Sequence, residues 1–187
     1  MTSAIHILNG TSLPDSRLEL IAPTVTEAFR FEARIMPSRL DMARAYDNSR
    51  KQHSSGALLS QILSSPGRAD EKCIAVVDAD LYIPVLTFVF GEAQFGGTAA
   101  VVSTHRLDNQ FYGLPPSDGL FMERLAKEII HELGHTFGLY HCRQFDCVMH
   151  SSTYVEEIDL KNAMPCSACT SMLNQLHHRT TVQQPAQ

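Results

Sequence analysis

The 187-residue sequence has little of what would place it in a membrane, on a nucleic acid or on a secretory route. Its apolar runs all fall well short of the roughly 20 residues that span a bilayer. Asp and Glu outnumber Lys and Arg by 20 to 15, and the net charge of -5 argues against a phosphate-binding surface. The opening "MTSAIHILNG" has neither a positive n-region nor a small-residue cleavage site. We therefore expect no membrane or nucleic-acid partner, and a location in the cytoplasm.

Internal repeats and low-complexity linkers are also missing from the sequence. The chain is long enough for one well-buried domain but hardly for two. We expect a single domain over residues 1–180, with an N-terminal subdomain over 1–141 and a small C-terminal subdomain over 142–180. The polar ending, residues 181–187, is expected to be a disordered tail.

Strand-like and helix-like segments alternate along the first part of the chain, which favours a mixed α/β (α+β) sheet. The strand-like runs are rich in β-branched residues: "AIHILN", "FEARIMP", "KCIAVVDADLY", "VLTFVFGEAQFGG" and "TAAVVSTHRL". Helical spacing predicts a helix capped by Asp15 and interrupted or kinked at Pro23, and a short helix over "GALLSQILSS". The Gly96-Gly97 pair separates the last two strands as a turn. One of these two strands should therefore form a sheet edge.

The segment "GLFMERLAKEIIHELGHTFG" carries the strongest helix pattern in the sequence. Asp118 precedes it as a candidate N-cap, and Gly138 stands where a glycine commonly ends a helix. Apolar residues recur at helical spacing and form one stripe: Leu125, Ile129, Ile130, Leu133 and Phe137. The pattern predicts an amphipathic helix that ends close to Gly138.

The end of this helix contains the motif "HELGHTFGLYH". His131 and His135 are four residues apart, so both imidazoles project from one face and can bind one metal ion, with zinc favoured. Glu132 can reach a water at that metal and take its proton as a general base. Gly138 lets the chain turn sharply and bring His141 back as a third ligand. The fourth position would stay open, as it does in catalytic zinc sites.

A different interpretation treats these residues as solvated side chains on a helix surface, because a bare HExxH pattern arises readily by accident. The extended pattern fixes two further positions, Gly138 and His141. Its host helix also has a cap, an apolar stripe and a terminating glycine. These features together favour the metal site.

The same residues resemble the signature of the metzincin zinc peptidases, HExxHxxGxxH followed by a methionine turn. Met149 is the candidate for that methionine. The resemblance implies that Met149 forms an apolar floor beneath the metal-binding imidazoles, and the alternative is an ordinary core methionine. The interval from His141 to Met149 is shorter than in many secreted metzincins.

Five cysteines, an odd number, fit poorly with a disulfide framework. Cys73 stands alone and is expected to pack as a small core residue. The others form two pairs around a sixteen-residue loop and suit a closed, structural zinc site: Cys142, Cys147, Cys166 and Cys169. The last pair precedes a helix-like segment, "TSMLNQLHH", whose N-terminus favours thiolates. A C-x-x-C redox pair, or His150 in place of one thiol, is an alternative reading.

Together, "HELGHTFGLYHC", "CVM" and "CSAC" resemble the archaemetzincin family, with a specific match over residues 131–169. A weaker resemblance extends back through "DADLYIPVLTFVFGEAQFGGTAAVVSTHRL". It implies a metzincin-like mixed sheet, an active-site helix and a zinc-stapled C-terminal subdomain. It also implies peptidase activity on peptides or proteins, with one catalytic and one structural zinc ion per chain.

The sequence thus predicts a zinc metallopeptidase in which the histidine-bound zinc polarises a water and the scissile carbonyl, with Glu132 as base. We expect the strand around Thr98, Ala100 and Val102 to bind substrate at an exposed sheet edge. Two alternatives belong to other classes. One is a module that holds a peptide in the zinc cleft without turnover, and the other is a zinc-ribbon interaction protein.

Overall fold

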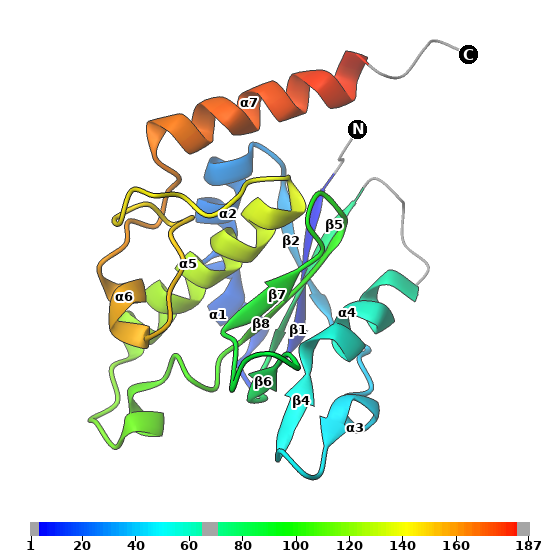
Figure 1. The fold of residues 1–187 in the computed structure, drawn as a ribbon, viewed down its shortest axis with the longest axis vertical. Helices are drawn as coiled ribbons and strands as arrows, with labels where there is room; N and C mark the ends of the chain where they lie inside the picture. The colour runs from blue at the N-terminus through cyan, green and yellow to red at the C-terminus, as the bar shows by residue number, and fades with distance from the viewer. Residues whose placement is uncertain (1–3, 65–70, 183–187) are drawn as a thin grey trace.

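The computed structural model describes residues 4–64 and 71–182, and a five-stranded sheet forms its centre (Figure 1). This main sheet contains β1 (Ile5–Gly10), β2 (Ala33–Pro37), β5 (Lys72–Val77), β7 (Gly91–Ala93) and β8 (Ala99–Ser103). Their spatial order is β2-β1-β5-β8-β7. All neighbouring strands run parallel except β7, which pairs antiparallel with β8. The expected mixed sheet is therefore confirmed.

Helices cover both faces of the main sheet (Figure 1). One face packs against α1 (Asp15–Glu19), α2 (Ala22–Phe29) and α5 (Asp118–Thr136), and the other packs against α3 (Met42–Ala45) and α4 (Ser55–Ser64). A second sheet contains β3 (Tyr46–Asp47), β4 (Gln52–Ser54) and β6 (Leu81–Tyr82). The remaining elements are η1 (Asn109–Tyr112), α6 (Val155–Asp159) and α7 (Ser167–Val182).

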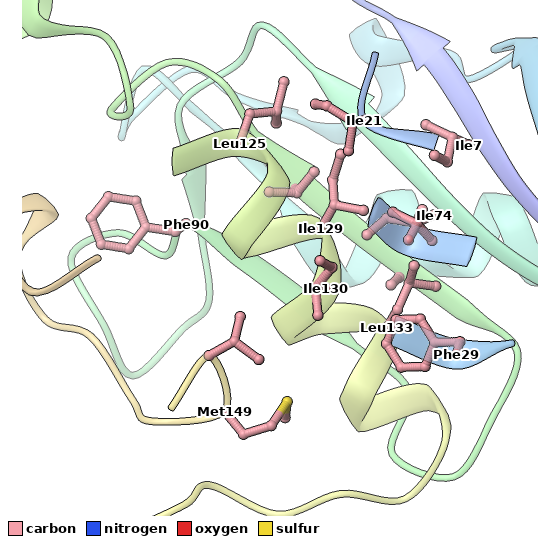
Figure 2. Close-up of a cluster of buried hydrophobic side chains, with 14 of the residues drawn as sticks. Ile7, Ile21, Phe29, Ile74, Phe90, Leu125, Ile129, Ile130, Leu133 and Met149 are labelled. Carbon is pink, nitrogen blue, oxygen red and sulfur yellow. The ribbon is translucent and has the colours of Figure 1, made fainter. Parts of the chain in front are cut away.

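The larger apolar core lies between the main sheet and α5, as Figure 2 shows. Ile7 and Ile74 point from the sheet toward Ile129 and Leu133 of α5, and all four side chains are fully buried. β8 is buried along its whole length, because helices cover both of its faces. Such burial explains why its sequence is a continuous apolar run without the alternation of a half-exposed strand.

The long helix α5 agrees with its sequence pattern except at its first residue. Ser117 is the N-cap residue, whereas Asp118 lies in the first turn, where its charge is favourable near the positive end of the helix dipole. At the other end, Gly138 has a φ of +92°, a conformation that glycine adopts without steric cost. The chain therefore reverses directly after the helix.

Two expected elements are each divided in the structure. The helix expected after Asp15 consists of α1 and α2, and Pro23 lies in the first turn of α2, where its missing N–H costs nothing. Asp15 is the first residue of α1, and Pro14 is the N-cap. The run "KCIAVVDADLY" forms β5 in the main sheet and then β6 in the second sheet.

The expectation that Thr98, Ala100 and Val102 lie on an exposed edge is wrong. β8 pairs with β5 on one side and with β7 on the other. Ala100 and Val102 are fully buried, and Thr98 lies in the bend before the strand. The antiparallel neighbour β7 is the edge strand at this side of the sheet.

Part of the expected disordered tail lies outside the described residues, which end at 182. Residues 181 and 182 are the last two of α7. Within residues 4–64 and 71–182, each helix is either too short or too polar to cross a membrane.

Arg124 connects three segments of the chain. Its side chain lies on α5 and is almost completely buried. It donates to both carboxylate oxygens of Asp159 in α6, at 2.6 and 2.7 Å. It also donates to the carbonyl of Leu107 at 2.8 Å and to Oδ1 of Asn109 at 2.9 Å. One guanidinium therefore fixes α6 and the η1 segment to α5.

We predict that Arg124→Gln lowers the free energy of unfolding by about 1–3 kcal/mol, because it leaves the buried carbonyl of Leu107 and the partly exposed carboxylate of Asp159 without their cation. Urea denaturation measures the loss. Arg34→Gln is the matched control, since Arg34 pairs with Glu32 on the surface at 2.6 Å and such pairs contribute about 0–1 kcal/mol. Equal losses in the two variants would contradict the prediction.

Candidate metal centres and active site

The end of α5 and the turn after it bring three imidazoles together. His131 and His135 lie on consecutive turns of the helix, and His141 follows the reversal at Gly138. One ring nitrogen from each of the three residues lies within 4.8 Å of the others. His131 is buried, His135 is half-buried and His141 is exposed. The cluster therefore opens toward solvent on the His141 side.

Two backbone carbonyls orient the helical imidazoles. Nδ1 of His131 lies 2.8 Å from the carbonyl of Val148, and Nδ1 of His135 lies 2.8 Å from the carbonyl of Leu139. Each Nδ1 can therefore carry the proton and donate, which leaves Nε2 free as a metal ligand. Burial lowers the pKa of both imidazoles, for His131 well below 6.5. Both are thus neutral at neutral pH, as metal ligands must be.

The histidine geometry fits a zinc ion. Ligands about 2.0–2.1 Å from a tetrahedral zinc lie about 3.3 Å from one another. Nε2 of His131 and Nε2 of His135 are 3.1 Å apart. When both Nδ1 atoms carry the proton, neither Nε2 atom has a hydrogen, so the two nitrogens face each other as acceptors and can bind one metal ion. Three nitrogen ligands and an open side are the donor set of catalytic zinc sites.

Met149 packs directly against the active-site helix (Figure 2). Its side chain is fully buried, and its sulfur would lie 2.4 Å from a Cβ atom placed on Gly134. The glycine between the two helical histidines therefore leaves the room that the methionine fills. The preceding residue, Val148, supplies the carbonyl that orients His131. The turn around Met149 thus contacts α5 at Gly134 through its side chain and His131 through its backbone.

Glu132 lies against the edge strand β7. It is 5% exposed, and a Cβ atom on Gly91 would lie 2.6 Å from its Cγ and 2.8 Å from its Cδ. Burial raises the pKa of Glu132 well above 4.5, and the charges of Glu128 and Glu92 raise it further. Lys161 opposes this rise. Gly91 is therefore the residue that allows the Glu132 carboxyl to occupy its place.

Behind Glu132 lies a buried ion pair. Nζ of Lys161 is 3.6 Å from Oε1 of Glu128, one turn before Glu132 on α5. Both side chains are almost completely buried, and burial acts on each pKa toward the neutral form, raising that of Glu128 and lowering that of Lys161. Each group opposes the effect of burial on the other, since Lys161 lowers the pKa of Glu128 and Glu128 raises that of Lys161.

Four thiols form a second cluster between the Met149 turn and α7. The Sγ atoms of Cys142, Cys147, Cys166 and Cys169 lie within 4.8 Å of one another. The Cys142–Cys166 and Cys147–Cys169 sulfur distances are 3.8 and 3.9 Å, so neither pair is a disulfide. Four sulfurs about 2.3 Å from a tetrahedral zinc lie about 3.8 Å apart. The cysteine cluster therefore fits a closed, structural zinc site.

Hydrogen bonds favour the thiolate of one member of this cluster, Cys166. Burial acts against ionisation of Cys166, but the backbone N–H of Cys169 and neighbouring thiols lower its pKa to about 7. Cys169 lies in the first turn of α7. The expected effect of that helix N-terminus is therefore seen at Cys166, whereas burial and the charge of Cys147 raise the pKa of Cys169.

The two clusters are joined through a short loop. The N–H of Cys142 donates to the carbonyl of Met149 at 2.8 Å. Nδ1 of His150 lies 2.8 Å from the carbonyl of Cys142, so His150 bonds to the backbone, outside both clusters. Because Cys142 follows His141 directly, an ion held by the four thiols would anchor the segment that presents the third imidazole.

Sequence reasoning missed Gly91, Gly134 and Lys161. A lone glycine inside a strand pattern signals close approach of another group, and "FGEA" offered that signal. A glycine inside a helix has the same meaning. No sequence pattern indicated that Lys161 is buried, because a single lysine in a polar loop is expected at the surface.

The fold and the two ligand clusters define a zinc metallopeptidase with an HExxH helix. A family model described as Peptidase family M54 matches residues 41–175, and the chain belongs to that family. An archaemetzincin of Thermococcus kodakarensis is 42% identical over 130 residues, which cover 69% of this chain and 70% of the relative. An archaemetzincin of Methanopyrus kandleri is 43% identical over 129 residues, with shares of 69% and 70%.

Solved structures show the same fold. The crystal structure of archaemetzincin from Methanopyrus kandleri has a TM-score of 0.82 and 34% identity, and covers 95% of this chain and 97% of that one. A zinc-dependent peptidase from Methanocorpusculum labreanum has a TM-score of 0.83 and 27% identity, with 91% and 100% covered. These relatives favour the enzyme over the peptide-holding module and the zinc-ribbon protein.

We predict that Gly91→Ala destabilises the protein by about 1–3 kcal/mol, because the new methyl group overlaps Glu132 and the carbonyl of Val101. In the Glu132→Ala background the loss should be smaller by about 0.5–3 kcal/mol, since one of the two overlaps is gone. Thermal or urea unfolding of the four proteins measures this coupling.

Gly119→Ala on α5 is the control, because nothing lies within 4 Å of its Cβ position. It should cost little in either background. Additive effects of Gly91→Ala and Glu132→Ala would show that the two residues are not in contact.

Proposed function

We propose that this protein hydrolyses peptide bonds at the cluster of His131, His135 and His141, with Glu132 as general base. The observation that carries the proposal is the convergence of three imidazole nitrogens on α5 and its reversal, beside a buried carboxyl on the same helix. Zinc in this cluster would supply the Lewis acidity that polarises a water and the scissile carbonyl.

Glu132 would handle the protons of the reaction. As the neighbour of a ligand, it can take a proton from the attacking water and later give it to the leaving amine. Its raised pKa suits a group that must both accept and release a proton near neutral pH. Gly91 and the Lys161–Glu128 pair would hold this carboxyl in place, and Met149 would support the imidazoles from below.

The free edge of β7 is the surface that we propose for the substrate backbone. Gln94 N donates to Ala99 O at 2.9 Å, and Ser103 N donates to Phe90 O at 2.8 Å. In an antiparallel ladder alternate residues bond to the neighbouring strand. The N–H and C=O groups of Gly91 and Ala93 therefore point away from β8. An extended peptide could pair with them as an added strand, next to Glu132.

The proposal includes two zinc ions per chain, one catalytic and one held by the four thiols. It also retains one domain over residues 1–180, in which the segment 142–180 supports the catalytic cluster. Residues of that segment, such as Val148 and Leu173, are buried in the same apolar core as α5. Thiol ligands persist in a reducing compartment, which is the reason to propose the cytoplasm.

Replacing Glu132 tests the general base. Glu132→Gln should keep both metals bound and lower peptide hydrolysis by about 10²–10⁴-fold, because the residue moves protons and is not a ligand. Metal content and turnover of a mixed peptide library measure the two effects. Glu123→Gln, an exposed change on the same helix, is the control and should keep its rate. Full activity in Glu132→Gln would refute the assignment.

Metal removal should separate the two zinc ions. Metal analysis should find two ions per chain, and brief chelation should remove the one at the open histidine cluster first. Hydrolysis should then stop while circular dichroism stays near native, since the hydrophobic core is unaffected. The thiol site should lose its ion more slowly, because four thiolates enclose it.

Cys147→Ser should weaken the second site and loosen the segment from 142 onward, because binding of a structural zinc contributes folding free energy. Hydrogen exchange measured by mass spectrometry would show the loosening. Catalysis should also fall, since Cys142 anchors His141. Cys73→Ser is the control at the lone thiol. One zinc per chain, or a Cys147→Ser protein with unchanged stability and hydrolysis, would defeat the scheme.

A further inference from the structure

Two aromatic side chains contact each other on the protein surface beside the histidine cluster. The rings of Phe95 and Tyr140 have their centroids 4.4 Å apart and are tilted by 36°. Although each covers part of the other, Phe95 remains 48% exposed and Tyr140 remains 70% exposed. The pair therefore presents apolar ring surface to solvent, which is unfavourable unless something covers it.

Phe95 belongs to a turn that is fixed to the end of α5. Gly96 N donates to the carbonyl of His135 at 2.9 Å. Nζ of Lys72 donates to the carbonyls of Thr136, at 2.8 Å, and of Gly97. Gly96 therefore bonds directly to the end of the helix, and Gly97 is connected to it through Lys72. An exposed ring on such a frame is pre-organised, so binding to it would cost little ordering entropy.

Tyr140 is fixed with equal firmness by its two neighbours. The carbonyl of Leu139 orients the imidazole of His135, and His141 is part of the cluster. The backbone of Tyr140 therefore has little freedom, and its ring points to solvent from a position adjacent to a predicted metal ligand.

The pair also lies where the free edge of β7 ends. Phe95 comes two residues after Ala93, the last residue of that strand. A peptide that pairs with β7 and crosses the histidine cluster would pass the two rings. Side chains of such a peptide alternate in direction, so one of them would face the pair.

We propose that Phe95 and Tyr140 form a subsite that receives an apolar side chain, aliphatic or aromatic, of the peptide substrate. This inference rests on the proposed peptidase function. The two rings offer an apolar surface with few rotatable bonds, which suits a hydrophobic residue. The enzyme should therefore prefer substrates with an apolar residue at one fixed position from the cleaved bond.

The test uses the zinc-loaded Glu132→Gln protein, which should bind peptides without cleaving them. Fluorescein-labelled decapeptides of one sequence would carry Leu, Phe or Ser at each position in turn, and anisotropy would give their dissociation constants. At one position Leu and Phe should bind about 10-fold more tightly than Ser. Phe95→Ala and Tyr140→Ala should remove this preference, with little change for the Ser peptides.

Tyr140→Phe keeps the ring and should keep the preference. Leu20→Ala is the control for loss of exposed apolar surface, since Leu20 is 70% exposed at the end of α1. With Glu132 intact, Phe95→Ala should raise KM for the apolar substrate several-fold and leave kcat nearly unchanged.

Binding with no preference at any position, or a preference that survives Phe95→Ala and Tyr140→Ala, would overturn the subsite. The two failures are distinguishable. Cleavage without a preference would leave the peptidase function standing and remove the subsite. A preference in binding by a protein that cleaves no peptide would keep the subsite and remove the function.

Discussion

Burial of α5 against the main sheet is the interaction on which the rest of the structure depends. Ile129 and Leu133 are fully buried, and each such side chain contributes about 1.5–3 kcal/mol relative to exposure. The same turns of the helix carry His131, Glu132 and His135. Moving any of these three side chains by displacing the helix would therefore open the core. The hydrophobic effect, which has no directional preference, thus fixes groups whose chemistry depends on direction.

Hydrogen bonds from outside the helix supply the direction that packing lacks. The carbonyl of Val148 orients His131, and Val148 follows Cys147 of the thiol cluster directly. Cys142 follows His141 in the same way, and its N–H bonds to Met149. A zinc ion bound by the four thiols would thus make the loop more rigid, and the backbone of this loop orients the ligands of the open histidine site. This arrangement explains why so short a C-terminal segment can support the active site without a core of its own.

Local patterns predicted the parts of the site that are close together in sequence. The spacing of His131 and His135 places both rings on one face of any α-helix, and Gly138 ends that helix in a conformation that glycine adopts without steric cost. The edge of the sheet was predicted wrongly for a related reason. Residues 98–103 and the run before them both have the sequence pattern of strands. Such a pattern does not indicate which strands pair with each other in the sheet. Pairing of β8 between β5 and β7 made it central.

The fold class, the long helix α5 and the seven candidate ligands could all be predicted from the amino-acid sequence, because helical periodicity and ligand chemistry are properties of short segments. Three features could be found only in the folded chain: β7 is the edge strand, Gly91 makes room for Glu132, and Lys161 reaches Glu128. Phe95 and Tyr140 meet for the same reason. Each of these contacts joins residues more than thirty positions apart, and their separation is set by strand order and helix docking. No local pattern encodes those two features, since they depend on how the whole apolar surface is buried.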